Sequence, residues 1–468
     1  MQDRPVPENK MGVMPVNKLL LSMAVPMMIS MLVQALYNVV DSVFVSRISE
    51  NALTAVSLAF PMQNLLISFA VGFGVGINAL MSRALGEKDP AHASRIAVSG
   101  MVLEAGSYVL FLIIGLFFTE TFMRAQISAE VPAEDAAEII AHGVSYLRIV
   151  LIFSFGVFAE ITYERILQST GRTTLSMITQ LIGAILNIIF DPILIFGYLG
   201  FPRLGASGAA IATVIARFVE AGVVMLWAHR NPERVPYLRG VYRSFRIPAA
   251  LARDIAKKSI PLLLNETLWA AGMALLAQCY SVRGYDVVSA YNICSTVSNV
   301  FNVAFMAMGN AVGILVGQLL GAGKMEEAAD TDRKLITFSV VICIVLGGLM
   351  SLVAHLFPQI YNTSDSIRDL AAAFIRICAL CMPINALANA CYFTLRSGGK
   401  TFVTFLFDSF YVCVLTVPMA FVLSRFTGLP IVPLFLCCQL ADIGKCVVGL
   451  IMIRRGVWIQ NIVGKEAA

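Results

Sequence analysis

Long apolar segments recur along almost the whole chain, separated by short polar segments. Each apolar segment reaches the length of about 20 residues that an α-helix needs to cross a bilayer. The pattern predicts an all-α integral membrane protein with twelve spanning helices, over residues 17–44, 53–82, 96–118, 140–165, 174–198, 206–228, 255–280, 287–319, 335–357, 367–394, 402–423 and 430–452. Composition agrees, because 58% of the 468 residues are hydrophobic and only 13% are charged, against about a quarter charged in soluble domains.

Lys and Arg residues concentrate in every second connection between the predicted helices. Of the 34 Lys and Arg residues, six fall in the other connections: Arg47, Arg124, Arg203, Arg283, Arg368 and Arg425. Since positive residues stay on the cytoplasmic side of a membrane, we expect a cell-membrane protein with both termini in the cytoplasm. The net charge of +5 thus reflects orientation in the membrane, and no nucleic acid partner is expected.

The two halves of the chain repeat one another. Residues 74–86 match residues 309–321 at an offset of 235, and residues 167–173 match residues 395–401 at an offset of 228. Each half then holds six helices in parallel orientation, and parallel repeats are a transporter architecture. We expect two six-helix lobes around a central cavity.

The chain divides at a polar and basic segment between the two repeats. We expect an N-lobe over residues 1–230 with the first six helices, a cytoplasmic linker over residues 231–250, and a C-lobe over residues 251–468. The substrate is then expected between the lobes.

Two carboxylates lie inside segments that otherwise predict spanning helices. Asp41 is six residues before Arg47, and Asp191 is 19 residues after Arg172. At 1.5 Å of rise per residue, Asp41 lies about 9 Å below the outer end and Asp191 about 28 Å above the inner end. Both are therefore in the outer half of the membrane, where a carboxylate costs roughly 2.5–3.5 kcal/mol or more. Such residues indicate a site that binds and releases a cation.

Amides accompany the two carboxylates on the same helix faces. Gln34 precedes Asp41 by seven residues, and Asn187 precedes Asp191 by four. Oxygen ligands suit Na⁺, and a pair of carboxylates in a dry cavity suits H⁺. The competing interpretation is a structural acid bonded to neighbouring amides or backbone. No other metal and no organic cofactor is expected.

A second group of charges is predicted lower in the C-lobe. Glu266 is eight residues after Lys258, and Asp408 is eight after Lys400, which places each about 12 Å from the inner face. On the last helix, Asp442 and Lys445 at i,i+3 spacing approach a similar depth. The four residues Glu266, Asp408, Asp442 and Lys445 are a candidate C-lobe charge network. A structural and a functional role are both open.

Several motifs in combination resemble the multidrug and toxic compound extrusion (MATE) family across nearly the whole chain. The carriers are Pro26 with Leu36-Tyr37-Asn38 and Asp41, Ser82-Arg83-x-Leu85-Gly86, Gln168-Ser169-x-Gly171-Arg172-Thr173, Asn187-x-x-x-Asp191-Pro192-Ile193-Leu194-Ile195, and Gly205-x-x-Gly208-Ala209-Ala210-x-Ala212-Thr213. The resemblance implies a multidrug efflux antiporter, not an enzyme, with rocker-switch alternating access driven by Na⁺ or H⁺. The expected substrates are small amphipathic or cationic organic compounds, and the expected state in the bilayer is a monomer.

The resemblance also assigns roles to individual residues. Asp41, Asn187, Asp191 and Thr213 match N-lobe positions that bind the coupling cation in the family. Gln34, Tyr37, Asn38 and Pro26 are expected to line the adjoining cavity. At the repeat offset of 235, Asp41 corresponds to Leu276, so we expect coupling to belong to the N-lobe alone.

Three other functions compete with this interpretation. A major-facilitator transporter is disfavoured, because the connection after the second helix reads Ser82-Arg83-Ala84-Leu85-Gly86 instead of a Gly-x-x-x-Asp-Arg pattern. The alternative is a flippase for lipid-linked oligosaccharides of the same superfamily, which needs several cations near the midplane. Arg217 and Lys445, the two available cations, are expected toward the inner ends. A membrane enzyme is disfavoured because the 4 histidines are isolated near helix ends.

Overall fold

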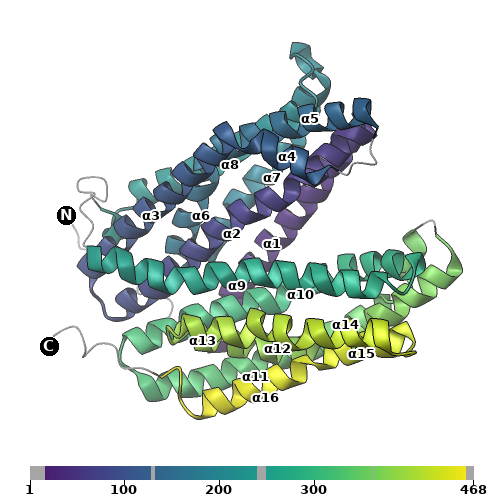
Figure 1. The fold of residues 1–468 in the computed structure, drawn as a ribbon. Coiled ribbons are helices and arrows are strands. Elements are labelled where there is room, and N and C mark those ends of the chain that lie inside the picture. Colours follow the sequence, from purple (N-terminus) through teal and green to yellow (C-terminus); the bar gives the residue numbers. More distant parts are fainter. Residues whose placement is uncertain (1–15, 128–131, 240–248, 362, 460–468) are drawn as a thin grey trace. The chain divides into compact units, whose positions relative to one another are not determined.

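The structure is a computed structural model that describes residues 16–127, 132–239, 249–361 and 363–459. Within these residues every regular element is a helix and no strand occurs (Figure 1). Eleven helices are long and apolar enough to cross a membrane, and a bent pair of helices brings the number to the predicted twelve. The all-α class predicted from the hydrophobic pattern is therefore confirmed.

The first half of the chain contains six spans and one short helix. Its helices are α1 (Val16–Ser46), α2 (Glu50–Gly86), α3 (Pro90–Phe117), α4 (Thr119–Gln126), α5 (Ala133–Ile152), α6 (Phe155–Gln168), α7 (Thr173–Phe196) and α8 (Ala206–Arg230). Short 3₁₀ turns follow α7 and α8, at η2 (Tyr198–Gly200) and η3 (Pro236–Leu238). Most of the six spans are longer than the apolar segments predicted from the sequence. The polar residues at their ends continue the helical hydrogen bonding of the backbone.

The second half contains the remaining six spans. They are α9 (Ala249–Ser281), α10 (Tyr285–Gly321), α11 (Met325–Val353), α12 (Asp365–Ser397), the composite span of α13 (Thr401–Phe405), η6 (Leu406–Phe410), η7 (Val412–Thr416) and α14 (Val417–Phe426), and the pair α15 (Ile431–Leu440) and α16 (Asp442–Arg454). A 3₁₀ turn, η5 (Phe357–Ile360), precedes α12. The segments η6 and η7 are π-helical, a geometry that often marks functional sites.

The fourth span differs from the sequence prediction of one continuous helix over residues 140–165. It consists of α5 and α6, which meet at an angle of 46°. The break lies at Phe153 and Ser154, and the Ser154 hydroxyl donates to the Leu151 carbonyl at 2.8 Å. A side chain that hydrogen-bonds back to the helix competes with the backbone bonding, which favours a kink.

The chain forms two compact units. Unit 1 contains Ile29–Met81 and Pro90–Ser259, and unit 2 contains residues 16–28, Ser82–Asp89 and Ile260–Ala468. These units differ from the predicted division at residues 230 and 251. Two segments of the first half belong to unit 2, and the boundary falls inside α9.

Close packing explains why the end of α2 belongs to unit 2. Gly86 lies against the backbone of Gln318 and Ala322, and Gly321 lies against the backbone of Arg83. Gly86 and Gly321 are equivalent at the repeat offset of 235, and so are Arg83 and Gln318. The two helix ends therefore make the same contact in both directions. Neither glycine leaves room for a Cβ atom.

The predicted linker is packed where the structure describes it. Val235, Tyr237 and Leu238 are buried, and η3 contacts α3. Burial raises the pKa of the Tyr237 phenol. Residues 240–248 of the predicted linker lie outside the described residues.

Each unit has its own aromatic core. In unit 1, Phe111 packs against Phe69 with ring centroids 5.3 Å apart and against Phe158 at 6.0 Å. In unit 2, Phe374 and Phe435 have ring centroids 4.5 Å apart. Helices α10, α11 and α12 run alongside one another in this unit (Figure 1).

Candidate functional site

Helices α7 and α8 pack antiparallel in unit 1 and position the predicted cation ligands. Gly208 of α8 lies against the backbone of Leu194, and Gly183 of α7 lies against the Glu220 side chain. The contact thus moves backward along α7 as it moves forward along α8. By this register, Thr213 on α8 lies at a level between Asn187 and Asp191 on α7.

Asp191 and Asn187 form a buried pair on α7. Their exposed fractions are 1% and 2%. In the orientation that satisfies both groups, the Asn187 amide donates to Asp191 Oδ1 and Oδ2, each at 2.9 Å. Pro192 follows directly and has no N–H, so the Ile188 carbonyl receives no helical hydrogen bond from that position. A carboxylate, an amide and a backbone carbonyl without its helical hydrogen bond are thus close together in α7.

Thr213 adds a hydroxyl near this level. Its Oγ1 is buried and has no hydrogen-bond partner among the described residues. Leaving a buried hydroxyl without a partner costs roughly 1–3 kcal/mol. An oxygen in that situation is available to a bound ion.

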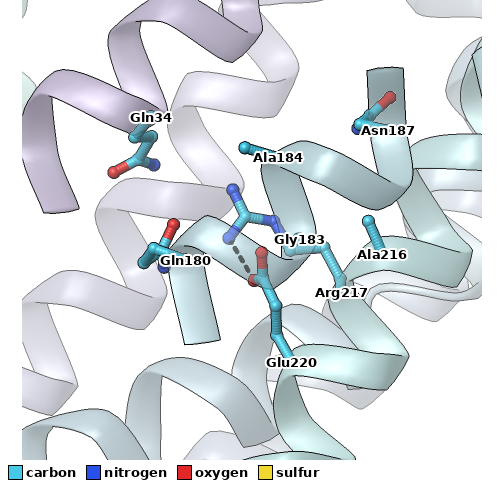
Figure 2. Close-up of a pocket in the computed structure, with 8 residues that line it drawn as sticks. All are labelled: Gln34, Gln180, Gly183, Ala184, Asn187, Ala216, Arg217 and Glu220. Atoms are coloured by element: carbon cyan, nitrogen blue, oxygen red, sulfur yellow. Dashed lines mark hydrogen bonds and ion pairs between the residues drawn. The ribbon is translucent and has the colours of Figure 1, made fainter. Parts of the chain in front are cut away.

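A cavity opens between α1, α7 and α8, next to the Asn187–Asp191 pair. It is small, because only about 10 Å³ is open to the centre of a water-sized sphere. Polar and small residues line it, as Figure 2 shows: Gln34, Gln180, Gly183, Ala184, Asn187, Ala216, Arg217 and Glu220. All of these residues belong to unit 1.

The cavity contains some of the residues that the sequence predicts for it. Gln34 and Asn187 line it. Pro26 is not among the lining residues and belongs to unit 2, eight residues before Gln34 on α1. The backbone of Tyr37, Asn38 and Asp41 is helical, but their side chains lie outside the described residues.

Sequence reasoning missed the charged part of the cavity wall. Arg217, expected near an inner helix end, lines the cavity together with Glu220. Arg217 Nη1 lies 2.8 Å from Glu220 Oε2 and 3.7 Å from Glu160 Oε2. The i,i+3 spacing of Arg217 and Glu220 on one helix was the available signal.

In unit 2 the structure brings together three of the four predicted charged residues. Lys445 Nζ lies 3.0 Å from Asp408 Oδ1 and 3.7 Å from Asp442 Oδ1. Asn265 Nδ2 donates to Asp408 Oδ2 at 3.1 Å. The fourth predicted residue, Glu266, follows Asn265 on α9, and adjacent residues of a helix point in different directions. Glu266 lies near the same group, since both Glu266 and Asp408 interact electrostatically with Tyr392.

Serine and the π-helical turn complete this second cluster. Ser409 follows Asp408 in η6, and its Oγ donates to the Asn265 side-chain oxygen at 2.7 Å. Lys445 also lies over the Tyr411 ring, 5.7 Å from its centroid. The cluster thus joins α9, the composite span and α16 within unit 2.

The comparisons with known proteins identify the architecture. The MatE family model matches residues 26–193 and 261–422, once in each repeat and over more than half of the chain. Relatives include the probable multidrug resistance protein YoeA of Bacillus subtilis, 25% identical over 87% of each chain. The probable multidrug resistance protein NorM of Thermotoga maritima is 22% identical over 96% of this chain and 94% of that protein.

A solved structure supports the fold. A crystal structure of MATE in the straight conformation matches with a TM-score of 0.86 and 22% identity, over 98% of this chain and 99% of that chain. The matched segments begin at Pro26 and Pro261, which are equivalent at the repeat offset. Because the family model recognises both repeats, the chain belongs to the MatE family of membrane transporters.

Proposed function

We propose that this protein is a secondary-active antiporter that exports small amphipathic or cationic organic compounds against an inward flow of Na⁺ or H⁺. Family membership and relatives named as multidrug resistance proteins support the class of substrate. The observation that carries the coupling proposal is the buried Asn187–Asp191 pair beside a polar cavity.

The coupling ion binds in unit 1 in this proposal. Asp191 supplies the charge, while Asn187 and Thr213 supply further oxygens. Asp41 is the fourth ligand: it lies seven residues after Gln34 on α1, or about 10 Å along the helix. Asp191 lies four residues, about 6 Å, beyond the lining residue Asn187, so both acids follow the cavity in the same direction.

Transport then requires alternating access. Ion binding shifts the population between inward-open and outward-open states, since a ligand favours the state that it binds more tightly. A rocker-switch motion of two lobes is the proposed form of this change. The distribution of Lys and Arg supports cytoplasmic termini and a cell-membrane location, and we propose that the monomer is the transporting unit.

The flippase alternative receives no support from the cavity. Binding an anionic pyrophosphate lipid needs cations that are not already compensated. Arg217, the one Lys or Arg among the described residues of the cavity lining, forms an ion pair with Glu220.

The test is transport of ethidium by the purified protein in proteoliposomes, with Na⁺ and H⁺ gradients imposed separately. Asp191→Asn should reduce gradient-driven transport at least tenfold, because the variant lacks the charge that holds the ion. Asp330→Asn is the matched control: Asp330 is an exposed acid whose ion pair with Lys334 lies on α11. Full transport by Asp191→Asn with both gradients would overturn the proposal.

A further inference from the structure

We propose that Glu160, Glu164, Glu220 and Arg217 form a proton-binding cluster in unit 1, separate from the Asn187–Asp191 pair, and that this cluster exchanges protons with the cavity. The proposal deepens the proposed function and rests on it for the direction of proton movement. Its physical basis is a set of buried carboxyl groups that outnumber their cations.

The three carboxyl groups are almost completely removed from solvent. The exposed fraction is 0% for Glu160, 9% for Glu164 and 3% for Glu220. Glu160 and Glu164 lie one turn apart on α6, while Arg217 and Glu220 lie on α8, which packs against α6. The groups therefore meet at one helix–helix interface.

Glu160 and Glu164 interact directly. Their side chains are within hydrogen-bonding reach of each other, and an ionised carboxylate has no hydrogen to donate. Glu160 Oε1 accepts from Gln180 Nε2 at 2.9 Å, while its Oε2 has no hydrogen-bond donor among the described residues. A proton shared by this pair gives the remaining oxygen its partner.

The balance of charge also favours a cluster that holds protons. Arg217 faces Glu160 and Glu220, and Arg165 donates to the Gln168 side chain that bonds Glu164. Even with both cations counted, full ionisation of the three carboxyl groups would leave one uncompensated negative charge inside a spanning segment. Burying even one unpaired charge costs several kcal/mol. Protons remove this cost without adding an ion, whereas a metal ion would be repelled by Arg217, which lies 3.7 Å from Glu160 Oε2.

Among the described residues, the helices that pack on α6 add no cation other than Arg217 to the cluster. The charged groups that interact with Glu160 are Glu164, Arg217 and Glu220, and α7 contributes the neutral amide of Gln180. Helix α3 also packs on α6, and its buried acid Glu104 interacts with no charged group among the described residues. Glu104 is therefore a buried acid outside the cluster.

The cluster touches the cavity through Arg217, through Glu220 and through the amide of Gln180. Gln180 both hydrogen-bonds Glu160 and lines the cavity (Figure 2). Glu220 lines it as well, and its carboxylate occupies the space left by the missing side chain of Gly183. Asn187 lies on the same cavity, seven residues after Gln180, or about 10 Å along α7.

The cluster also continues away from the cavity, toward the connection between α6 and α7. Gln168 Nε2 donates to Glu164 Oε1 at 2.8 Å and lies 3.5 Å from Ser176 Oγ. In the proposed orientation this connection is cytoplasmic. Polar groups therefore extend from the inner end of unit 1 through Glu164 and Glu160 to the cavity that Asn187 lines.

The transfer is a simple proton movement. In the proposed exchange a hydronium ion in the cavity gives a proton to a carboxylate oxygen of the cluster. An O–H bond of the hydronium ion breaks, which leaves a water molecule, and a new O–H bond forms at Glu220 or Glu160. The reverse step returns the proton to water.

The first measurement is infrared spectroscopy of the full-length protein in lipid vesicles, in the carbonyl-stretch region of protonated carboxylic acids. Glu160→Gln and Glu164→Gln should each remove absorption that the wild-type protein shows, and Asp191→Asn should retain it. Glutamine keeps the size of the side chain and can still accept from Gln180. If neither variant removes any absorption, the carboxyl groups are ionised and the proposal fails.

The second measurement is H⁺-driven ethidium transport by the same proteins across a pH series. Glu160→Gln should shift the pH profile, whereas Glu104→Gln, which alters a buried acid outside the cluster, should not. An unshifted profile for Glu160→Gln would overturn proton exchange with the cavity. If Asp191→Asn retains full transport, the proposed function fails, and the infrared result still decides whether the cluster binds protons.

Discussion

The two charge clusters within the spanning segments differ in how completely their oxygens are satisfied. In unit 2, one Asp408 oxygen forms an ion pair with Lys445, and the other accepts a hydrogen bond from Asn265. In unit 1, Glu160 Oε2 has no hydrogen-bond donor among the described residues, and its ion-pair distance to Arg217 is 3.7 Å. A cavity adjoins the cluster in unit 1 through Arg217 and Glu220.

This difference separates a structural cluster from one suited to ion movement. A buried charge with every oxygen paired is costly to disturb, because each change leaves an unpaired group behind. A carboxyl group with an unpaired oxygen can gain a partner by binding a proton. We therefore expect substitutions in unit 2 to affect stability and substitutions in unit 1 to affect transport.

The largest expected effect is the loss of stability caused by Lys445→Met. Removing the cation leaves Asp408 and Asp442 uncompensated, which should cost roughly 3 kcal/mol. Thermal unfolding of the purified protein measures the loss. Adding Asp408→Asn and Asp442→Asn to Lys445→Met should recover much of it, because no uncompensated charge is then left.

The matched change in unit 1 is Arg217→Met. It should destabilise the protein less than Lys445→Met, because carboxyl groups that hold protons lose less when the guanidinium is removed. The contrast between the clusters is lost if the two single variants unfold at the same temperature.

A smaller loss of stability is expected from Gly183→Ala. The new Cβ would overlap the Glu220 carboxylate, and displacing a packed group costs about 1–3 kcal/mol. Transport should fall with stability, because Glu220 lines the cavity. Gly222→Ala is the control on α8, since a Cβ at that position meets no atom within 4 Å; equal behaviour of the two variants would show that the packing at Gly183 is unimportant.

The smallest changes in stability are expected when one hydroxyl group is removed from each unit. Ser409→Ala should lower the free energy of unfolding by about 1 kcal/mol, because Ser409 Oγ donates to Asn265. Thr213→Val should not lower it and should raise it by up to about 1 kcal/mol, since the variant removes a buried hydroxyl whose Oγ1 has no partner among the described residues. Ion-driven transport should fall for Thr213→Val and persist for Ser409→Ala. The opposite pattern would exclude Thr213 as a ligand.

The hydrophobic pattern predicted the fold because the bilayer imposes one length on every span. It could not predict the break at Ser154, since no proline marks it and the apolar run continues through it. It also could not predict that α2 ends in unit 2. That assignment depends on close contact between Gly86 and Gly321, which becomes visible only once the helices are packed.

Depth along single helices predicted part of the two clusters. It brought Asp408, Asp442 and Lys445 to one level, because their distances from helix ends are set by the constant rise of the helix. It did not find Asn265, the neighbour of Glu266 that donates to Asp408, since depth does not specify which face of α9 turns inward. Arg217 was underrated for the same reason: its neighbours Glu160 and Gln180 lie on other helices, whose register the sequence does not state.

The contact between Gly86 and Gly321 also bears on ancestry. Each glycine packs against the backbone of the residue three positions before the other glycine. Gly86 lies against Gln318, and Gly321 lies against Arg83. Such reciprocity defines an isologous interface, the kind formed by two identical subunits around a two-fold axis. At this point the two repeats keep the geometry of an interface between identical subunits, although the equivalent positions hold different residues, Arg83 and Gln318.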